Sequence, residues 1–264
     1  MKNNNKISFC ISFVIFLLFF ANIAEAENFE IGVRYNPEFT CLLNKNDNNA
    51  GRALGYTSNF AYYSYGAGAI FNFNSNLGLA ADILFSREGQ RFAGTFNGDP
   101  VDAATYSSVV NRQAIQNNIV ITGNYVAKSE LNYIKLPIMF SVTSDNTGLF
   151  FFTLLVGPQI NFLSSVAQEI NHNDTDYPNS NITSKNLYKS ITFDGVIALG
   201  SSYNISNNMV LSARLRLDYG FSDVENKALM VSYSGATPVS FYSPNRQATH
   251  NLTIGLILGL DFKL

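Results

Sequence analysis

The sequence predicts an all-β protein: an eight-stranded antiparallel transmembrane β-barrel with short periplasmic turns and long extracellular loops. Three observations predict this fold. Apolar and polar residues alternate in eight segments, the connections between these segments alternate between short and long, and charged residues gather on one face of each segment. The chain also carries only 14 % charged residues, against roughly 25 % in soluble domains.

The composition excludes three other classes of protein. Apolar residues make up 47 % of the chain, which excludes a disordered protein. The formal net charge is -2, so no basic excess exists to neutralise phosphates, and we expect no nucleic-acid partner. The two cysteines, Cys10 and Cys41, are too few for a disulfide framework or a thiolate zinc site.

The N-terminal segment has the pattern of a secretory signal peptide. Lys2 and Lys6 precede an uncharged apolar run over 7–21, and Ala24-Glu25-Ala26 is the small-x-small pattern of a cleavage site. An uncleaved anchor is the alternative, but the strongly apolar part is shorter than the ~20 residues that span a bilayer. We therefore expect cleavage after Ala26, which leaves a barrel domain over 27–264 after a signal peptide over 1–26.

Each predicted strand has an apolar face and a polar face, because its side chains alternate with a period of two. The strands, in chain order, are Phe29–Phe39, Asn59–Phe73, Leu77–Glu88, Tyr133–Thr143, Phe150–Asn161, Ile191–Ile205, Leu211–Tyr219 and Asn251–Leu264. Their apolar faces hold, in the same order, Val33 and Tyr35, Tyr65 and Phe71, Ile83 and Phe85, Ile138 and Phe140, Phe152 and Val156, Ile197 and Leu199, Leu215 and Leu217, and Leu256 and Leu258.

The connections between the strands differ in length in a regular way. Asn74-Ser75-Asn76, Ser144–Gly148 and Ser206-Asn207-Asn208 are tight polar turns. Between them lie long polar stretches near 41–57, 89–129, 165–190 and 222–247. Short turns at one rim and long loops at the other are typical of bacterial outer-membrane barrels. We therefore expect a bacterial outer-membrane protein with both termini in the periplasm.

Alternation alone would also fit a soluble β-sandwich, but the charges sort by face. Apart from Arg87, which lies near a loop, the apolar faces carry almost no charge. The polar faces, which would line the lumen of a barrel, carry five basic residues, Arg34, Lys135, Arg214, Arg216 and Lys263, and seven acidic residues, Glu30, Glu38, Asp82, Glu88, Asp194, Asp218 and Asp261.

The charged lumen is the candidate site. Eight strands enclose an interior just wide enough for side chains, and a buried charge without a partner is costly. We therefore expect a network of paired charges that plugs the barrel; a narrow ion path is the alternative. Its predicted members are Arg34, Asp82, Glu88, Lys135, Asp194, Arg214, Arg216, Asp218 and Asp261, with Arg214, Arg216 and Asp218 at its centre.

The sequence predicts no catalytic, cofactor or metal site. His172 lies in an Asn- and Asp-rich stretch over 171–176 that superficially resembles a metal loop, but the stretch lacks the glycine and the distal glutamate of a calcium hand. Neither His172 nor His250 can be placed beside a nucleophile or an acid. We therefore expect no enzymatic activity, no cofactor and no bound metal.

Three short motifs follow one another along the chain: Leu131–Ile138, with an aromatic residue, Ile and Pro, Leu154–Ile160, with Gly-Pro, and Phe193–Gly200, with Asp-Gly and a later Gly. An apolar, Gly-spaced final strand follows them. In these motifs the chain resembles the PorT-like family of small outer-membrane β-barrels (outer membrane protein beta-barrel domain). The resemblance covers nearly all of the mature chain. It implies an outer-membrane barrel, and for some relatives a role alongside protein secretion, but no catalytic residues.

Three functions remain open. The first is a closed barrel with a structural or interaction role at the cell envelope, for which a charge-balanced lumen is the better fit. The second is a small pore for ions or small solutes. The third is a surface adhesin that acts through the loops near 41–57 or 89–129. The expected partners are outer-membrane lipid, the barrel assembly machinery during insertion, and envelope or secretion proteins.

Overall fold

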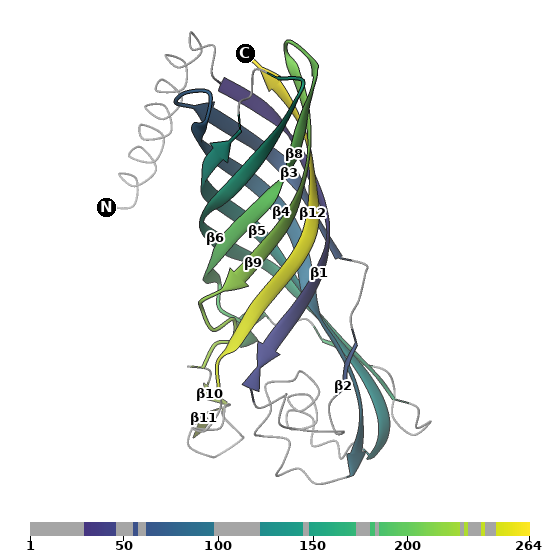
Figure 1. Cartoon of the computed structure of the whole chain (residues 1–264). Helices are drawn as coiled ribbons and strands as arrows, with labels where there is room; N and C mark the ends of the chain where they lie inside the picture. The colour runs from purple at the N-terminus through teal and green to yellow at the C-terminus, as the bar shows by residue number, and fades with distance from the viewer. Residues whose placement is uncertain are drawn as a thin grey trace, which may run out of the picture.

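Eight long antiparallel strands form a closed barrel, which confirms the predicted fold class (Figure 1). The computed structural model describes residues 29–45, 55–57, 62–97, 122–144, 148–172, 180–182, 185–227, 230–231, 239–240 and 247–264. The barrel strands are β1 (Phe29–Asn44), β3 (Tyr62–Asn72), β4 (Leu77–Asn97), β5 (Thr122–Thr143), β6 (Phe150–His172), β8 (Ile191–Ser206), β9 (Met209–Gly220) and β12 (Thr249–Lys263). Each pairs with the next in this order, and β12 pairs with β1 to close the barrel.

Short strands and one turn of 3-10 helix lie at one end of the barrel. β2 (Gly55–Thr57) pairs with β4, β7 (Ser180–Ile182) pairs with β6, and β10 (Met230–Val231) pairs with β11 (Val239–Ser240). One turn of 3-10 helix, η2 (Lys185–Leu187), precedes β8. In the described part of the chain, no helix is long and apolar enough to cross a membrane.

The two ends of the barrel differ in their connections. At the turn end, which lies at the top of Figure 1 beside the C-terminus, tight turns join β3 to β4 and β8 to β9. In the first of these turns, Asn74 Oδ1 accepts hydrogen bonds from the backbone N–H groups of Asn76 (2.9 Å) and Leu77 (2.8 Å), as Asn does in turns. The turn expected at Ser144–Gly148 lies partly outside the described residues, at 145–147. The opposite end, where β2 and η2 lie, is called the loop end.

Several strands are longer than the sequence predicts. Residues 89–97 of β4 pair with residues 122–130 of β5, so the prediction of a loop over 89–129 is wrong at both flanks. β1 reaches Asn44 and β6 reaches His172, which shortens two more predicted loops. These added strand residues are mostly polar and do not alternate, so hydropathy carries no strand signal there. The backbone pairing alone defines them.

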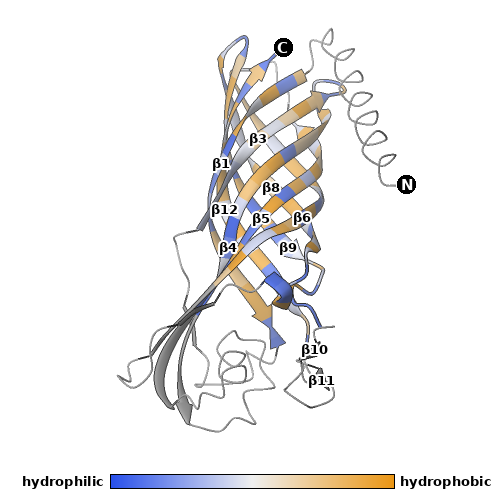
Figure 2. Ribbon diagram, turned by 180° about the vertical axis from the view of Figure 1, so that it is seen from behind, coloured by the Kyte–Doolittle hydropathy of each residue, from blue (hydrophilic) through white to orange (hydrophobic). Residues whose placement is uncertain are grey.

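Hydrophobic and hydrophilic residues alternate along the strands (Figure 2). The large side chains exposed on the outer face of the wall are apolar, and the aromatic ones among them lie in two girdles. The loop-end girdle consists of the exposed side chains of Tyr35, Phe39, Tyr63, Tyr65, Phe85, Phe162, Phe193, Tyr219 and Phe221. The turn-end girdle consists of Phe73, Phe140, Phe150, Phe152, Tyr203 and Phe262. Aliphatic side chains such as Ile83, Leu215 and Leu256 are exposed between them. An apolar band flanked by aromatic girdles is the lipid-facing surface of a membrane barrel.

Candidate functional site

The strands bring the predicted charged residues into the lumen. Inward positions alternate with outward ones, as in β9, where Arg214, Arg216 and Asp218 are buried between exposed leucines. The nine residues predicted for the network come from β1, β4, β5, β8, β9 and β12, and each is at most 5 % exposed. They form two groups of contacts, described below as the Lys135 cluster and the Arg34 cluster.

The Lys135 cluster holds two cations against two carboxylates. Lys135 Nζ contacts Glu88 Oε1 and lies 3.1 Å from Asp218 Oδ2. Arg216 Nε lies 2.7 Å from Asp218 Oδ1, and Arg216 Nη2 lies 3.2 Å from Asp218 Oδ2. Asp218 therefore accepts from both cations, which come from β5 and β9 on different sides of the lumen. This arrangement gives each charged group an opposite charge within hydrogen-bonding distance.

Gln159 joins Asp194 to this cluster. Its amide Nε2 donates to Asp194 Oδ2 at 3.2 Å and lies 3.4 Å from Asp218 Oδ2, while its Oε1 accepts from Arg216 Nη2. Sequence reasoning did not include Gln159 in the network, because a neutral amide gives no charge signal. The only sequence feature that could have placed Gln159 in the network is its position on the polar face of a predicted strand. Asp194 therefore joins the network through the Gln159 amide.

The Arg34 cluster lies nearer the turn end. Arg34 Nε lies 3.3 Å from Asp82 Oδ1, and Arg34 Nη1 lies 2.6 Å from Asp261 Oδ1. A glycine makes the room for these groups, because a Cβ atom at Gly68 would lie 1.8 Å from Asp82 Oδ1 and 3.2 Å from Arg34 Nε. One guanidinium thus bridges carboxylates on two other strands, β4 and β12.

Arg214 belongs to this second group but is less fully paired. Its Nη2 lies 3.4 Å from Ser202 Oγ, and its Nε has no hydrogen-bond partner. Together with Arg34, Asp82 and Arg216 it lines a cavity with a water-accessible volume of about 10 Å³, which is the volume that about one water molecule needs. Arg214 was predicted at the centre of the network together with Arg216, but the structure places the two arginines in different groups.

Some lumen charges have neutral partners instead. Glu38 accepts hydrogen bonds from Asn36 Nδ2 (2.6 Å), Ser64 Oγ (3.1 Å) and Ser86 Oγ (2.9 Å). At the turn end, Glu30 accepts from Asn72 Nδ2 (3.1 Å), and Lys263 donates to Asn204 Oδ1 (3.0 Å). These contacts give the buried carboxylates of Glu38 and Glu30 and the part-buried ammonium of Lys263 hydrogen-bond partners without an ion pair.

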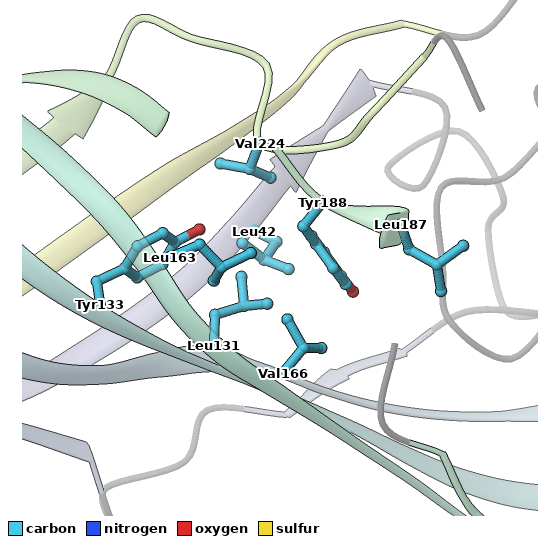
Figure 3. Close-up of a cluster of buried hydrophobic side chains, with 8 residues drawn as sticks. All are labelled: Leu42, Leu131, Tyr133, Leu163, Val166, Leu187, Tyr188 and Val224. Atoms are coloured by element: carbon cyan, nitrogen blue, oxygen red, sulfur yellow. The ribbon is translucent and has the colours of Figure 1, made fainter. Parts of the chain in front are cut away.

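Apolar side chains pack beside the charges in the lumen. Ile70, Ala80, Met139, Leu155, Val196 and Ala198 form a buried cluster, and all of them except Val196 line the cavity beside Arg34 and Arg214. At the loop end, a second buried cluster consists of Leu42, Leu131, Tyr133, Leu163, Val166, Leu187, Tyr188 and Val224 (Figure 3). The first cluster lies on faces that the sequence predicts to be polar, whereas the second, apart from Tyr133, lies outside the predicted strands. The inward placement of both clusters was not predicted.

The second apolar cluster closes the loop end of the barrel. Two connecting segments, 185–190 and 221–227, meet over the lumen through a bridge between Tyr188 and Glu225. Backbone hydrogen bonds of 2.9 Å join Asn226 N to Leu187 O and Lys189 N to Val224 O. The side chains of Leu187, Tyr188 and Val224 are at most 2 % exposed. We call these two segments the roof.

The histidines lie apart from the network. His250 Nδ1 lies 2.9 Å from Gly220 O, and its ring stacks on Tyr219 with the centroids 5.9 Å apart. His172 is the last residue of β6, so the predicted loop begins after it; the rest of that stretch, 173–176, lies outside the described residues. Among the residues that the structure describes, no three His, Cys, Asp or Glu side chains are grouped as metal ligands.

Known proteins resemble the chain at the level of the whole barrel. The family described as outer membrane protein beta-barrel domain matches residues 20–226. No curated protein is a significant match. Among solved structures, OprG from Pseudomonas aeruginosa is 8 % identical, with a TM-score of 0.43, covering 90 % of this chain and 95 % of that one. Neisserial surface protein A is 11 % identical, with a TM-score of 0.41, covering 89 % of this chain and 97 % of that one. The attachment invasion locus protein Ail of Yersinia pestis is 9 % identical, with a TM-score of 0.39, covering 89 % of this chain and 99 % of that one.

Proposed function

Because the chain belongs to the outer membrane protein beta-barrel domain family, we propose that it is a closed, non-conducting and non-enzymatic barrel with a structural or interaction role at the cell envelope. In this proposal, the barrel is a rigid frame for its loop end. The partners are then the lipid around the band, the assembly machinery during insertion, and envelope or secretion proteins at the loops.

The occluded lumen is the observation that carries this proposal. The Lys135 and Arg34 clusters fill the middle of the barrel with paired charges, one apolar cluster packs beside the Arg34 cluster, and another lies at the loop end. The cavity beside Arg34 and Arg214 has room for about one water molecule. A pore needs a continuous water-filled path, so this interior supports a plug better than the alternative of an ion or solute channel.

The orientation and the secretion role are further parts of the proposal. We place both termini in the periplasm, after cleavage of a signal peptide behind Ala26, because short turns face the periplasm in bacterial barrels. The loop end then faces outward. The PorT-like motifs Leu131–Ile138, Leu154–Ile160 and Phe193–Gly200 favour a role alongside protein secretion. An adhesin would use the same loop end, and the interaction partner decides between these two roles.

Conductance tests the closed lumen directly. The purified barrel is inserted into planar lipid bilayers beside a double variant, Leu187→Ala and Tyr188→Ala, that weakens the roof. We expect no stable channel steps from either protein, because the paired charges still fill the lumen of the variant. Steady channel steps from the wild type would contradict the proposal and favour the pore.

The native size of the protein tests the interaction role. The barrel is extracted gently from outer membranes, and the proteins that migrate with it are identified. A large complex with defined companions is expected from an envelope or secretion component. A lone barrel of monomer size would contradict the assembly role and favour adhesion.

A further inference from the structure

A single serine hydroxyl lies between two carboxyl groups in the lumen. Ser86 Oγ is 2.9 Å from Glu38 Oε1 and 2.8 Å from Glu88 Oε1. All three side chains are buried. Both distances are those of O–H···O hydrogen bonds. A hydroxyl group has only one hydrogen to donate, so Ser86 cannot be the donor in both contacts.

Two ionised carboxylates would leave one of these contacts without a hydrogen. If Ser86 donates to Glu38, Glu88 Oε1 faces a lone pair of Ser86 Oγ at 2.8 Å. If Ser86 donates to Glu88, Glu38 Oε1 faces such a lone pair at 2.9 Å. The low dielectric constant of a buried site would not screen this repulsion. A proton on one carboxyl group removes the conflict, because that group then donates to Ser86 and Ser86 donates to the other.

The contacts of the two carboxyl groups decide which of them holds the proton. Glu88 Oε1 also contacts the ammonium group of Lys135. An opposite charge so close favours the ionised form of a carboxyl group. The hydrogen-bond contacts that the structure describes for Glu38 are all with neutral side chains. The proton therefore belongs on Glu38.

The second oxygen of Glu38 fits the neutral acid as well. Glu38 Oε2 accepts from Asn36 Nδ2 at 2.6 Å and from Ser64 Oγ at 3.1 Å. Two acceptor lone pairs are what a carbonyl oxygen offers. Oε2 thus acts as the carbonyl oxygen, and Oε1 as the hydroxyl that donates to Ser86. In this arrangement each of the two serine hydroxyls has an acceptor of its own, Glu38 for Ser64 and Glu88 for Ser86.

The charge balance around Glu38 favours the same assignment. The charged groups that act on Glu38 are Lys135, Arg216, Glu88 and Asp218. These two cations and two carboxylates offset one another, so an ionised Glu38 would add a net negative charge to the Lys135 cluster. Asp194, which Gln159 joins to the same cluster, adds a further acidic group. The titratable side chain in register with Glu38 on β3, Tyr62, donates its hydroxyl to Ser129 O at 3.4 Å.

We propose that Glu38 is a proton-binding site of the lumen: at neutral pH the folded barrel holds it as a neutral carboxylic acid that donates to Ser86, which in turn donates to the ionised Glu88. The proton comes from water when the barrel folds, and no other covalent bond forms or breaks. The site goes beyond the proposed function, because it does not depend on conductance, on a partner or on the direction in which the loop end faces.

The proton ties the stability of the barrel to pH. Glutamate in an unfolded chain ionises near pH 4.3, so at neutral pH the folded barrel binds a proton that the unfolded chain releases. The free energy of unfolding then falls as the pH rises, because the folded state binds more protons than the unfolded state. The folding constant should fall about tenfold for each pH unit over which the folded acid keeps its proton.

Infrared spectroscopy of the reconstituted barrel at neutral pH detects the proton directly. The C=O stretch of a protonated carboxylic acid lies apart from the carboxylate bands, so the difference spectrum between the wild type and Glu38→Gln should contain it. The matched control, Glu130→Gln, removes a carboxylate that contacts Arg87 and Lys128, and its difference spectrum should contain carboxylate bands alone. A Glu38→Gln difference spectrum without the carboxylic acid band would overturn the proposal.

A serine variant keeps the test valid if Glu38→Gln fails to fold. In Ser86→Ala the acid loses the acceptor of its hydrogen, so its C=O band should move to higher frequency. Ser212→Ala, which removes another buried serine hydroxyl of the lumen, is the matched control and should leave the band in place. An unchanged band in Ser86→Ala would contradict the contact between the acid and Ser86.

Urea unfolding at about pH 6 and about pH 9 gives an independent measurement. The wild type should lose more stability between these two pH values than Glu38→Gln, which has no proton to release at this position. Glu130→Gln should show the same pH dependence as the wild type. Equal losses in the wild type and Glu38→Gln would overturn the proton site.

Discussion

Two neighbouring residues of β9 show how differently the two faces of the wall use their side chains. Leu215 points outward and is 68 % exposed, whereas Arg216 points into the lumen and is 2 % exposed. In a soluble protein, the opposite distribution would be expected. The difference teaches that the outer face needs only to be apolar, whereas the inner face needs particular partners for particular atoms.

Substitutions on the two faces should therefore destabilise the barrel for different reasons. On the outer face, a new charge is harmful because lipid offers it no partner, and its depth in the membrane sets the cost. On the inner face, the loss of a charge is harmful because its former partner stays buried and unpaired. Four sets of substitutions, ordered by the expected loss of stability, test this difference.

The largest loss is expected on the inner face, at Lys135. Lys135→Met leaves Glu88 without its ammonium partner and Asp218 with one cation fewer. Breaking a buried pair from one side costs about 3–5 kcal/mol. Urea unfolding of the reconstituted barrel, followed by its heat-modifiable electrophoretic mobility, measures this loss. Lys189→Met, at an exposed position, is the control; an equal effect of both variants would mean that the pairing in the lumen does not matter.

The next loss is expected on the outer face. Leu256→Arg and Leu258→Arg, in the middle of the apolar band, should each cost about 2–4 kcal/mol, and Ile205→Arg, beside a turn, about 0–1 kcal/mol. All three side chains are exposed, so packing does not distinguish them. Insertion efficiency into liposomes and the free energy of unfolding are measured. Equal costs at the three positions would show that membrane depth is not what the outer face responds to.

The sequence predicts the outer face well because that face has only one requirement. Exposed side chains such as Ile83, Leu215 and Leu256 fall where a period of two places them. The inner face is mixed, and Leu84 and Met139 point into the lumen among polar neighbours. Hydropathy cannot distinguish such residues from lipid-facing ones. The apolar lumen clusters therefore became visible only in the structure.

The sequence also could not predict which charged side chains pair inside the lumen, for a second reason. Burial of Arg214 and Arg216 follows from alternation on β9, but their partners lie on strands that are distant in sequence. Lys135 meets Asp218 only because the closure and stagger of the barrel place β5 and β9 at the same height. The roof is a similar case, because Leu187 and Val224 belong to segments without periodicity.

Substitution of Arg214 should lower the free energy of unfolding less than substitution of Arg216. Arg216→Met removes contacts to Asp218 and Gln159 and should approach the effect of Lys135→Met. Arg214→Met removes only a 3.4 Å contact to Ser202 and a diffuse positive charge, so we expect about 1–2 kcal/mol. The same urea unfolding assay compares the two variants. An Arg214 variant as unstable as the Arg216 variant would show that total charge, and not pairing, holds the lumen together.

The smallest loss is expected at Glu38, which separates a buried charge from a buried charge pair. Its contacts are the side chains of Asn36, Ser64 and Ser86, all of them neutral. In Glu38→Gln, the amide oxygen still accepts from these donors, and the amide N–H can donate to a serine hydroxyl or to Asn36 Oδ1, which has no partner in the native protein. The cost should therefore stay within about 1 kcal/mol. If the variant loses as much stability as Lys135→Met, the carboxylate of Glu38 acts as a counter-charge for the Lys135 cluster. The stability of the inner face would then depend on the summed field of the lumen rather than on its individual pairs.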